Sequence, residues 1–217
     1  MCKALATAVA TASMMLWAGS AQAVGPVVTA SARALNGYGS STGQYSASAL
    51  ASVPTTSGSD CRCGGYVRAS AALPGTFGAS GDYTSYFQSS VSSMSTLRQT
   101  LNYTVAGAAE DTITSIYFEV YGNLSASHIS GGGLLSSEFT WDIQGYGEPV
   151  SGYARSFVDY STNKNYEFSK IIGFDIIGSS GSVDMTFANS FIMGAIDGST
   201  GGSSTVTIKL LEYPDNV

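Results

Sequence analysis

The sequence predicts an all-β fold, an antiparallel β-sandwich of the jelly-roll type. Three observations support this class: apolar residues alternate with polar ones, Gly-rich segments interrupt the alternation, and helical periodicity is scarce. Alternation puts successive side chains on opposite faces of a strand, so that one face can enter a core. A parallel α/β fold would instead require helical segments between its strands.

The clearest strand lies within residues 112–121. Its two faces carry Ile116, Phe118 and Val120 on one side and Tyr117, Glu119 and Tyr121 on the other. The same period of two predicts strands in four further runs: Leu101, Tyr103 and Val105; Phe139, Trp141 and Ile143; Val183, Met185 and Phe187; Val206, Ile208 and Leu210. Strands are also expected at 153–160 and 166–172, and Gly-rich connections at 131–133, 145–147, 178–181 and 198–202.

Two segments fit more than one structure. Residues 24–72 are rich in Ala, Ser and Gly, and Ala side chains bury little apolar area. They are expected to form either edge strands or a loosely ordered N-terminal part. Residues 84–98 can be placed at strand or helix spacing, and the strand is favoured because the segment is dense in Ser.

The N-terminus predicts a secretory signal peptide over residues 1–23. Lys3 is followed by an apolar run at 4–18, too short for a membrane span, and the small residues Ala21 and Ala23 flank Gln22. This pattern predicts cleavage after Ala23. The mature chain, 24–217, is expected to be one domain that is secreted or held at the cell surface, with no integral membrane segment.

The charge balance disfavours two classes of partner. Nine Lys and Arg residues stand against fifteen Asp and Glu residues, a formal net charge of −6, and no basic cluster occurs. Nucleic acid and anionic membranes require a positive surface, so neither is expected as a partner. A surface rich in hydroxyls and tyrosines suits contact with polysaccharide or self-association.

Two cysteines, Cys61 and Cys63, remain after the predicted cleavage. In a strand, residues two apart lie about 6.6 Å from each other, at the far end of the disulfide range, so a bridge between them needs a tight turn. Three alternatives stay open: a local disulfide, which is favoured, a bridge between chains, and free or metal-bound thiols.

The aromatic residues carry the best binding signal, because a ring face can stack on a sugar while its polar group donates a hydrogen bond. Tyr117 and Tyr121, in phase with Glu119, are the candidate ligand-binding residues. Trp141 alternates in phase with Phe139 and is expected in the core.

Catalytic and metal sites have weaker support. His128 is the single histidine and is expected in a solvent-exposed loop, so a site based on it is disfavoured. Glu119 and Glu138 could form the carboxyl pair of a glycosidase if they lie on neighbouring strands. No catalytic residue, metal ligand or cofactor is therefore assigned, and a structural calcium ion held by dispersed loop acids stays open.

The Ala-rich start, the Ala/Ser/Gly opening and the strand at 182–192 together resemble the secreted β-sandwich passenger domains of bacterial proteins sorted by the exosortase (PEP-CTERM) system. That resemblance implies an extracellular, non-catalytic protein linked to the cell surface or to exopolysaccharide. The family's C-terminal Pro-Glu-Pro motif, apolar helix and basic tail are not found at 212–217. The expected function is that of a structural or adhesive surface protein, then a carbohydrate-binding module, and last a glycan-active hydrolase.

Overall fold

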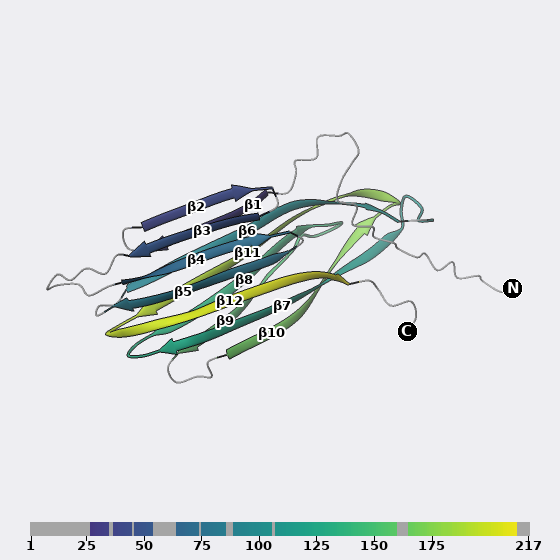
Figure 1. Cartoon of the computed structure of the whole chain (residues 1–217). Coiled ribbons are helices and arrows are strands. Elements are labelled where there is room, and N and C mark those ends of the chain that lie inside the picture. Colours follow the sequence, from purple (N-terminus) through teal and green to yellow (C-terminus); the bar gives the residue numbers. More distant parts are fainter. Residues whose placement is uncertain are drawn as a thin grey trace.

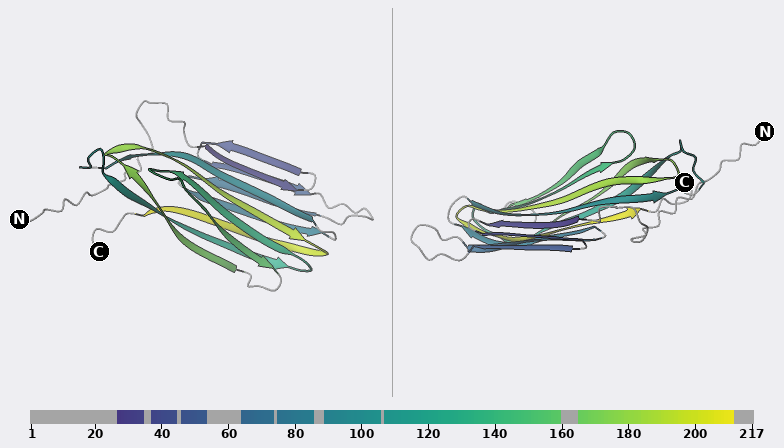
Figure 2. Two further views of the ribbon diagram at one scale, coloured as in Figure 1. Left: turned by 180° about the vertical axis from the view of Figure 1, so that it is seen from behind. Right: turned by 90° about the horizontal axis from the view of Figure 1, so that it is seen from above.

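Two antiparallel sheets of six strands pack face to face in the computed structural model, which confirms the predicted β-sandwich (Figure 1; Figure 2). The structure describes residues 27–34, 37–44, 46–53, 64–73, 75–85, 89–105, 107–159 and 165–211. In spatial order, the first sheet contains β2 (Gly37–Gly43), β1 (Val27–Ala34), β6 (Ser89–Thr104), β11 (Ser180–Ala195), β8 (Leu134–Gln144) and β9 (Val150–Asp159). The second contains β10 (Asn165–Ile177), β7 (Ile113–Ile129), β12 (Gly198–Leu211), β5 (Thr76–Ser85), β4 (Gly64–Ala72) and β3 (Ser46–Val53).

The last eight strands form a jelly roll. Strand β8 pairs with β9, β7 with β10, β6 with β11 and β5 with β12, so that each antiparallel pair encloses the next. From β5 to β8 the chain changes sheet at every step, and from β9 to β12 it does so again. This nesting is the arrangement expected of an antiparallel ribbon that is wound into two layers.

The first four strands extend this jelly roll at one margin. Strands β1 and β2 add to the first sheet beside β6, and β3 and β4 add to the second beside β5. Of the two structures expected for residues 24–72, the described residues adopt the strands. Alanines fill the core between these strands, namely Ala30, Ala32, Ala47, Ala49, Ala51, Ala69 and Ala71. Because alanine is small, the layers must approach closely here to exclude water.

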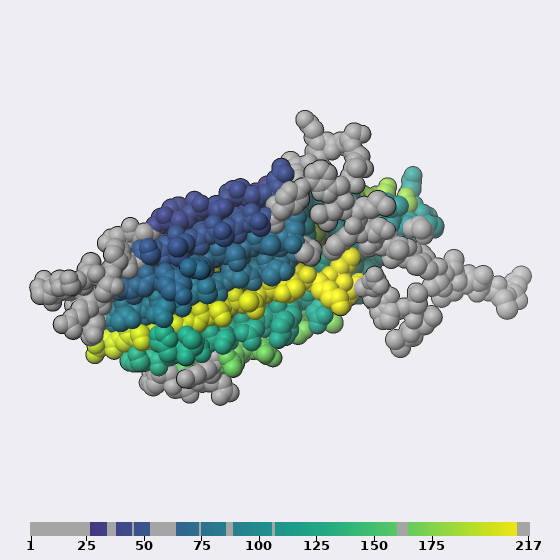
Figure 3. Space-filling view, viewed as in Figure 1, coloured from purple at the N-terminus to yellow at the C-terminus, as the bar shows by residue number. Residues whose placement is uncertain are grey.

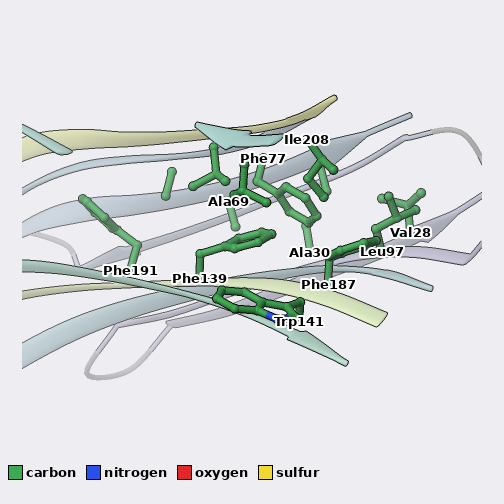
Figure 4. Close-up of a cluster of buried hydrophobic side chains, with 14 of the residues drawn as sticks. Val28, Ala30, Ala69, Phe77, Leu97, Phe139, Trp141, Phe187, Phe191 and Ile208 are labelled. Carbon is green, nitrogen blue, oxygen red and sulfur yellow. The ribbon is translucent and has the colours of Figure 1, made fainter. Parts of the chain in front are cut away.

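Aromatic rings from both sheets meet in the core of the jelly roll (Figure 4). Phe77 of β5 contacts Phe139 of β8 edge to face, with ring centroids 5.5 Å apart. Phe118 of β7 lies 6.2 Å from Phe187 of β11 in a similar arrangement. Both pairs cross from one sheet to the other, and these are the geometries that aromatic rings favour. Trp141, predicted in the core, is 5% exposed and confirms that expectation.

Among the described residues, five glycines lie opposite an aromatic or imidazole residue on the neighbouring strand whose ring occupies the space of the missing side chain. The pairs are Gly122–Phe168, Gly152–Trp141, Gly173–Tyr117, Gly181–Tyr103 and Gly201–His128. In each pair a methyl group added to the glycine would lie within 2.7 Å of the ring. Glycine normally weakens a strand because it has no side chain to pack, and a neighbouring ring that covers it compensates. In each of these pairs the ring can therefore lie over the glycine backbone of the neighbouring strand.

One connection and the position of one histidine differ from the sequence prediction. The Gly-rich run at 198–202 begins strand β12, and the turn before it is formed by Ile196 and Asp197. Gly198 is required there because a side chain would lie 2.1 Å from the carbonyl oxygen of Ser130. The expected loop histidine, His128, lies instead near the end of β7.

Helices do not occur within the described ranges, so nothing there has the length and hydropathy of a membrane-spanning helix.

The glycine–ring pairs predict which glycine substitutions destabilise the fold. Gly152→Ala should lower the free energy of unfolding by about 1–3 kcal/mol, because the new methyl would lie 2.5 Å from the buried ring of Trp141. Gly201→Ala should change it by less than about 0.5 kcal/mol, because the half-exposed His128 ring can rotate away. Chemical denaturation of both variants tests this. Equal losses would contradict the role assigned to the buried ring.

Candidate functional site: an aromatic pocket beside β7 and β10

An open pocket of about 510 Å³ lies where the β8–β9 connection folds against β10. Both sheets contribute to it. Strands β7 and β10 of the second sheet provide one wall, and the connection at 145–149 together with the start of β9 provides the other. Its lining combines aromatic, apolar and acidic groups: Ile113, Ser115, Tyr117, Tyr146, Gly147, Glu148, Val150, Gly173, Phe174 and Asp175.

Tyr117 is positioned by the glycine opposite it. Gly173 of β10 pairs directly with Tyr117 of β7. A methyl group on Gly173 would lie 2.7 Å from Cε1 and 3.0 Å from Cδ1 of the tyrosine ring. The ring therefore covers the backbone of β10 and leans toward the pocket. A bulkier residue at 173 would force the ring away from β10.

The carboxylate of Asp175 is held two residues further along β10. The Ser115 hydroxyl donates a hydrogen bond of 2.6 Å to its Oδ1. The backbone carbonyl of the same residue accepts a 2.7 Å bond from the N–H of Tyr146. This backbone bond anchors the β8–β9 connection to β10. Gly147, with a φ of 85°, supplies the left-handed residue that this tight connection requires.

The pocket has the chemistry to bind a ligand with one apolar face and several hydroxyls. Tyr117 and Tyr146 offer ring surface and phenolic groups, and the Tyr146 side chain is 49% exposed. Asp175 and Glu148 offer carboxylate acceptors. Small-ligand sites combine apolar and aromatic surface with convergent polar groups, and this pocket offers both in similar measure.

The structure brings one of the three predicted ligand-binding residues into this pocket. Tyr117 lines it, while Glu119 and Tyr121 continue the same outer face along β7. Figure 3 shows this outer face of the second sheet, on which β7 lies beside the yellow β12. Glu119 accepts a hydrogen bond from Ser169 of β10 at 3.3 Å, and Tyr121 is 44% exposed. On β10, the exposed side chain of Ile171 lies directly opposite Glu119. The predicted face therefore forms a strip that leads away from the pocket.

The suggested carboxyl pair of Glu119 and Glu138 is not brought together. Glu119 points outward from the second sheet, because its neighbours Phe118 and Val120 are buried. Glu138 points outward from the first sheet, next to the buried Phe139, and its Oε2 lies 3.3 Å from Nε of Arg155. The two carboxyls thus lie on opposite outer faces. The condition for such a pair, that the two residues lie on neighbouring strands, is not met because the chain changes sheet between β7 and β8.

His128 contacts a serine and an aspartate on the outer face of the second sheet. Its Nδ1 lies 3.3 Å from Oγ of Ser127, and its Nε2 lies 3.8 Å from Oδ1 of Asp82. An activated serine needs a base within about 2.6–3.2 Å and a third group that orients this base. Both distances exceed that range. A surface ion pair of this kind contributes roughly 0–1 kcal/mol when the ring is protonated.

The described residues contain no group of side chains suited to a metal ion, and they do not include the two cysteines. Within the described ranges, no group of three or more His, Cys, Asp or Glu side chains gathers at distances that could hold an ion. Cys61, Cys63 and the predicted signal peptide all lie outside those ranges.

Sequence reasoning missed Ser115, Tyr146, Glu148 and Asp175. Ser115 is two residues before Tyr117 on β7, so the alternation of the strand predicts that both side chains share one face. Tyr146 and Glu148 flank Gly147 in a predicted connection, yet nothing in the sequence says which strand that connection meets. Their contribution depends on the bond between Tyr146 and Asp175, which are 29 positions apart in the sequence.

Comparison with known proteins adds little to this description of a jelly-roll sandwich with an aromatic pocket. No protein-family model matches the chain, and no curated protein matches it. Among solved structures, TmCBM61 in complex with beta-1,4-galactotriose aligns with a TM-score of 0.22 and 10% identity, over 70% of this chain and 88% of that one. A structure of infectious bursal disease virus, Gt strain, aligns with a TM-score of 0.18 and 12% identity, over 87% of this chain and 65% of that one. At these scores neither likeness bears on function.

The position of Tyr117 can be tested without any ligand. In the wild-type protein, the α-protons of Gly173 should show an upfield NMR shift from the ring current of Tyr117. Tyr117→Ala should abolish this shift, and Gly173→Ala should change the ring resonances of Tyr117 because the new methyl occupies the ring's place. Ordinary Gly173 shifts in the wild type would contradict the described geometry.

Proposed function

We propose that the protein is an exported, non-catalytic glycan-binding protein that acts as an adhesive component of the cell surface or extracellular matrix. The observation that carries this proposal is the Tyr117 ring over Gly173, beside the carboxylate of Asp175. The N-terminal pattern at 1–23 supports export. Adhesion follows if the bound glycan belongs to a cell wall or matrix.

A sugar ring has an apolar face and polar hydroxyls, and the pocket offers partners for both. One face of a pyranose carries C–H groups that pack on an aromatic ring, and its hydroxyls bond to carboxylate and phenolic groups around the edge. Asp175 accepts a bond from Ser115 through Oδ1, so it keeps acceptor capacity for a ligand hydroxyl. The strip with Glu119 and Tyr121 offers contacts for further units of a chain.

A self-associating structural protein is the second candidate. The observation that favours it is that, among the described residues, strands at the ends of the sheets have one side of the backbone without a neighbouring strand, and such a side can pair with another chain. The two functions are compatible where association uses β2 or β3, because the marginal strands that line the pocket are β9 and β10.

Removal of either pocket tyrosine should weaken glycan binding. An aromatic contact contributes about 0.5–1.5 kcal/mol beyond the area it buries, so Tyr117→Ala and Tyr146→Ala should each reduce affinity roughly tenfold or more. Calorimetry with the polysaccharide that binds best in a panel would measure this. The Tyr146 backbone bond to Asp175 persists in the alanine variant.

Tyr153→Ala is the matched control. Tyr153 is 65% exposed on the outer face of the first sheet, away from the pocket, and its loss should leave affinity unchanged. The pocket would be excluded as the glycan site if Tyr117→Ala and Tyr146→Ala bound as tightly as the wild type.

The pocket should select neutral over acidic polysaccharides. Asp175 and Glu148 are carboxylates, and the whole chain has a net charge of −6, so a polyanion is repelled. Galactan, mannan or cellulose oligosaccharides should bind about tenfold or more tightly than alginate of equal length at low salt. Asp175→Asn keeps the oxygen that accepts the Ser115 hydrogen bond and should reduce the difference in affinity between neutral oligosaccharides and alginate. Higher salt should reduce this difference too, because it screens the repulsion. Equal affinity for alginate would contradict the expectation.

A further inference from the structure

Among the described residues, each sheet ends in two marginal strands whose backbone pairs with a neighbouring strand on one side only. These strands are β2 and β9 in the first sheet and β3 and β10 in the second (Figure 1). An unpaired margin is a template for another strand, and natural proteins protect it with charges, prolines, bulges or a covering element. The four margins of this protein differ in that protection.

The β9–β10 side is protected by charge and by contacts between the two sheets. Strand β9 carries Arg155, and β10 carries Glu167, Lys170 and Asp175. Nζ of Lys170 lies 4.7 Å from the centre of the Trp141 ring, so this lysine spans from the second sheet to the first. A strand that docked here would have to displace or desolvate these charges.

Strand β3 is covered by β2. A methyl group on Gly39 would lie 2.2 Å from the carbonyl oxygen of Leu50, and one on Gly43 would lie 2.2 Å from that of Ser46. These carbonyl groups of β3 therefore face the bare backbone of β2. The two glycines allow β2 to close this side of the sandwich over β3.

The free margin of β2 carries no charge and no proline of its own. Its sequence, Gly-Tyr-Gly-Ser-Ser-Thr-Gly, contains no charge and no proline over seven residues. Tyr38, Ser40 and Thr42 are exposed on its outer face, and Tyr38 is 72% exposed. On the neighbouring strand β1, Arg33 lies opposite Tyr38.

We infer that β2 pairs antiparallel with β2 of a second copy of this chain, which joins the two first sheets into one continuous sheet. A two-fold axis through Ser40 sets Ser40 opposite its own copy and sets Tyr38 opposite Thr42. Both are favourable cross-strand pairs, a hydroxyl pair and an aromatic with a β-branched residue. The strand carries no charge and can pair with its own copy in this register. Because a two-fold contact uses the same surface of both chains, association stops at the dimer.

Sedimentation velocity on the protein beginning at Val24, in reducing buffer and across a concentration series, tests this inference. The wild type should dimerise. Ser40→Lys should raise the dimer dissociation constant about fivefold or more, because the two lysines face each other across the axis. Ser48→Lys on β3 is the matched control, since Ser48 is an exposed serine on the covered margin, and it should leave the dissociation constant unchanged.

A charge-complementation experiment completes the test. Mixing the Ser40→Lys and Ser40→Glu variants should restore association to the wild-type level or beyond. Circular dichroism and thermal unfolding of each variant establish that it is folded. The inference is overturned if the wild type stays monomeric at all concentrations, if Ser48→Lys weakens association as much as Ser40→Lys, or if the mixture fails to associate. Because no glycan is present, these outcomes are independent of the pocket.

Discussion

The contact between the two inner faces is the interaction on which the rest of the structure depends. A single sheet of long strands leaves one apolar face in water, and here the inward rings of Phe77 and Phe118 meet those of Phe139 and Phe187 from the other layer. The chain can change sheet repeatedly because a strand in either sheet buries its inward apolar face in the same core. The outward faces are then free to carry hydroxyls, tyrosines and acids without loss of stability.

The glycine–ring pairs resolve a conflict within this plan. The chain contains 26 glycines, and many lie inside strands, where glycine costs conformational entropy and packs poorly. Opposite a ring, the absence of a side chain becomes useful, because the ring can lie over the glycine backbone. Trp141 uses this space inside the core, whereas Tyr117 uses it on the surface beside the pocket. One device thus serves packing in the first case and a candidate binding site in the second.

Local pattern was sufficient to predict the fold class, because alternation reports which face of a strand is buried. Phe118, Val120 and Trp141 are buried as the alternation predicts. The glycines at 198–202 were misassigned because glycine marks turns and close backbone contacts alike, and only the neighbouring strand distinguishes the two. Whether Glu119 and Glu138 could pair was open at the level of sequence for a related reason: alternation gives the face of a strand but not the sheet to which the strand belongs. Tyr146 and Asp175 likewise meet through topology, which no local pattern encodes.

The order of the strands also sets how far apart the margins of the molecule lie. Strands β10 and β3 occupy opposite ends of the six-stranded second sheet, five interstrand steps or roughly 24 Å from each other. The pocket lies beside β10, and β2 covers β3 at the other end. Two copies joined through β2 would therefore present their pockets at the two far ends of the assembly. Such a particle is bivalent, with its sites too widely spaced for one short oligosaccharide, so it would bridge separate glycan chains and gain avidity in a dense polysaccharide network.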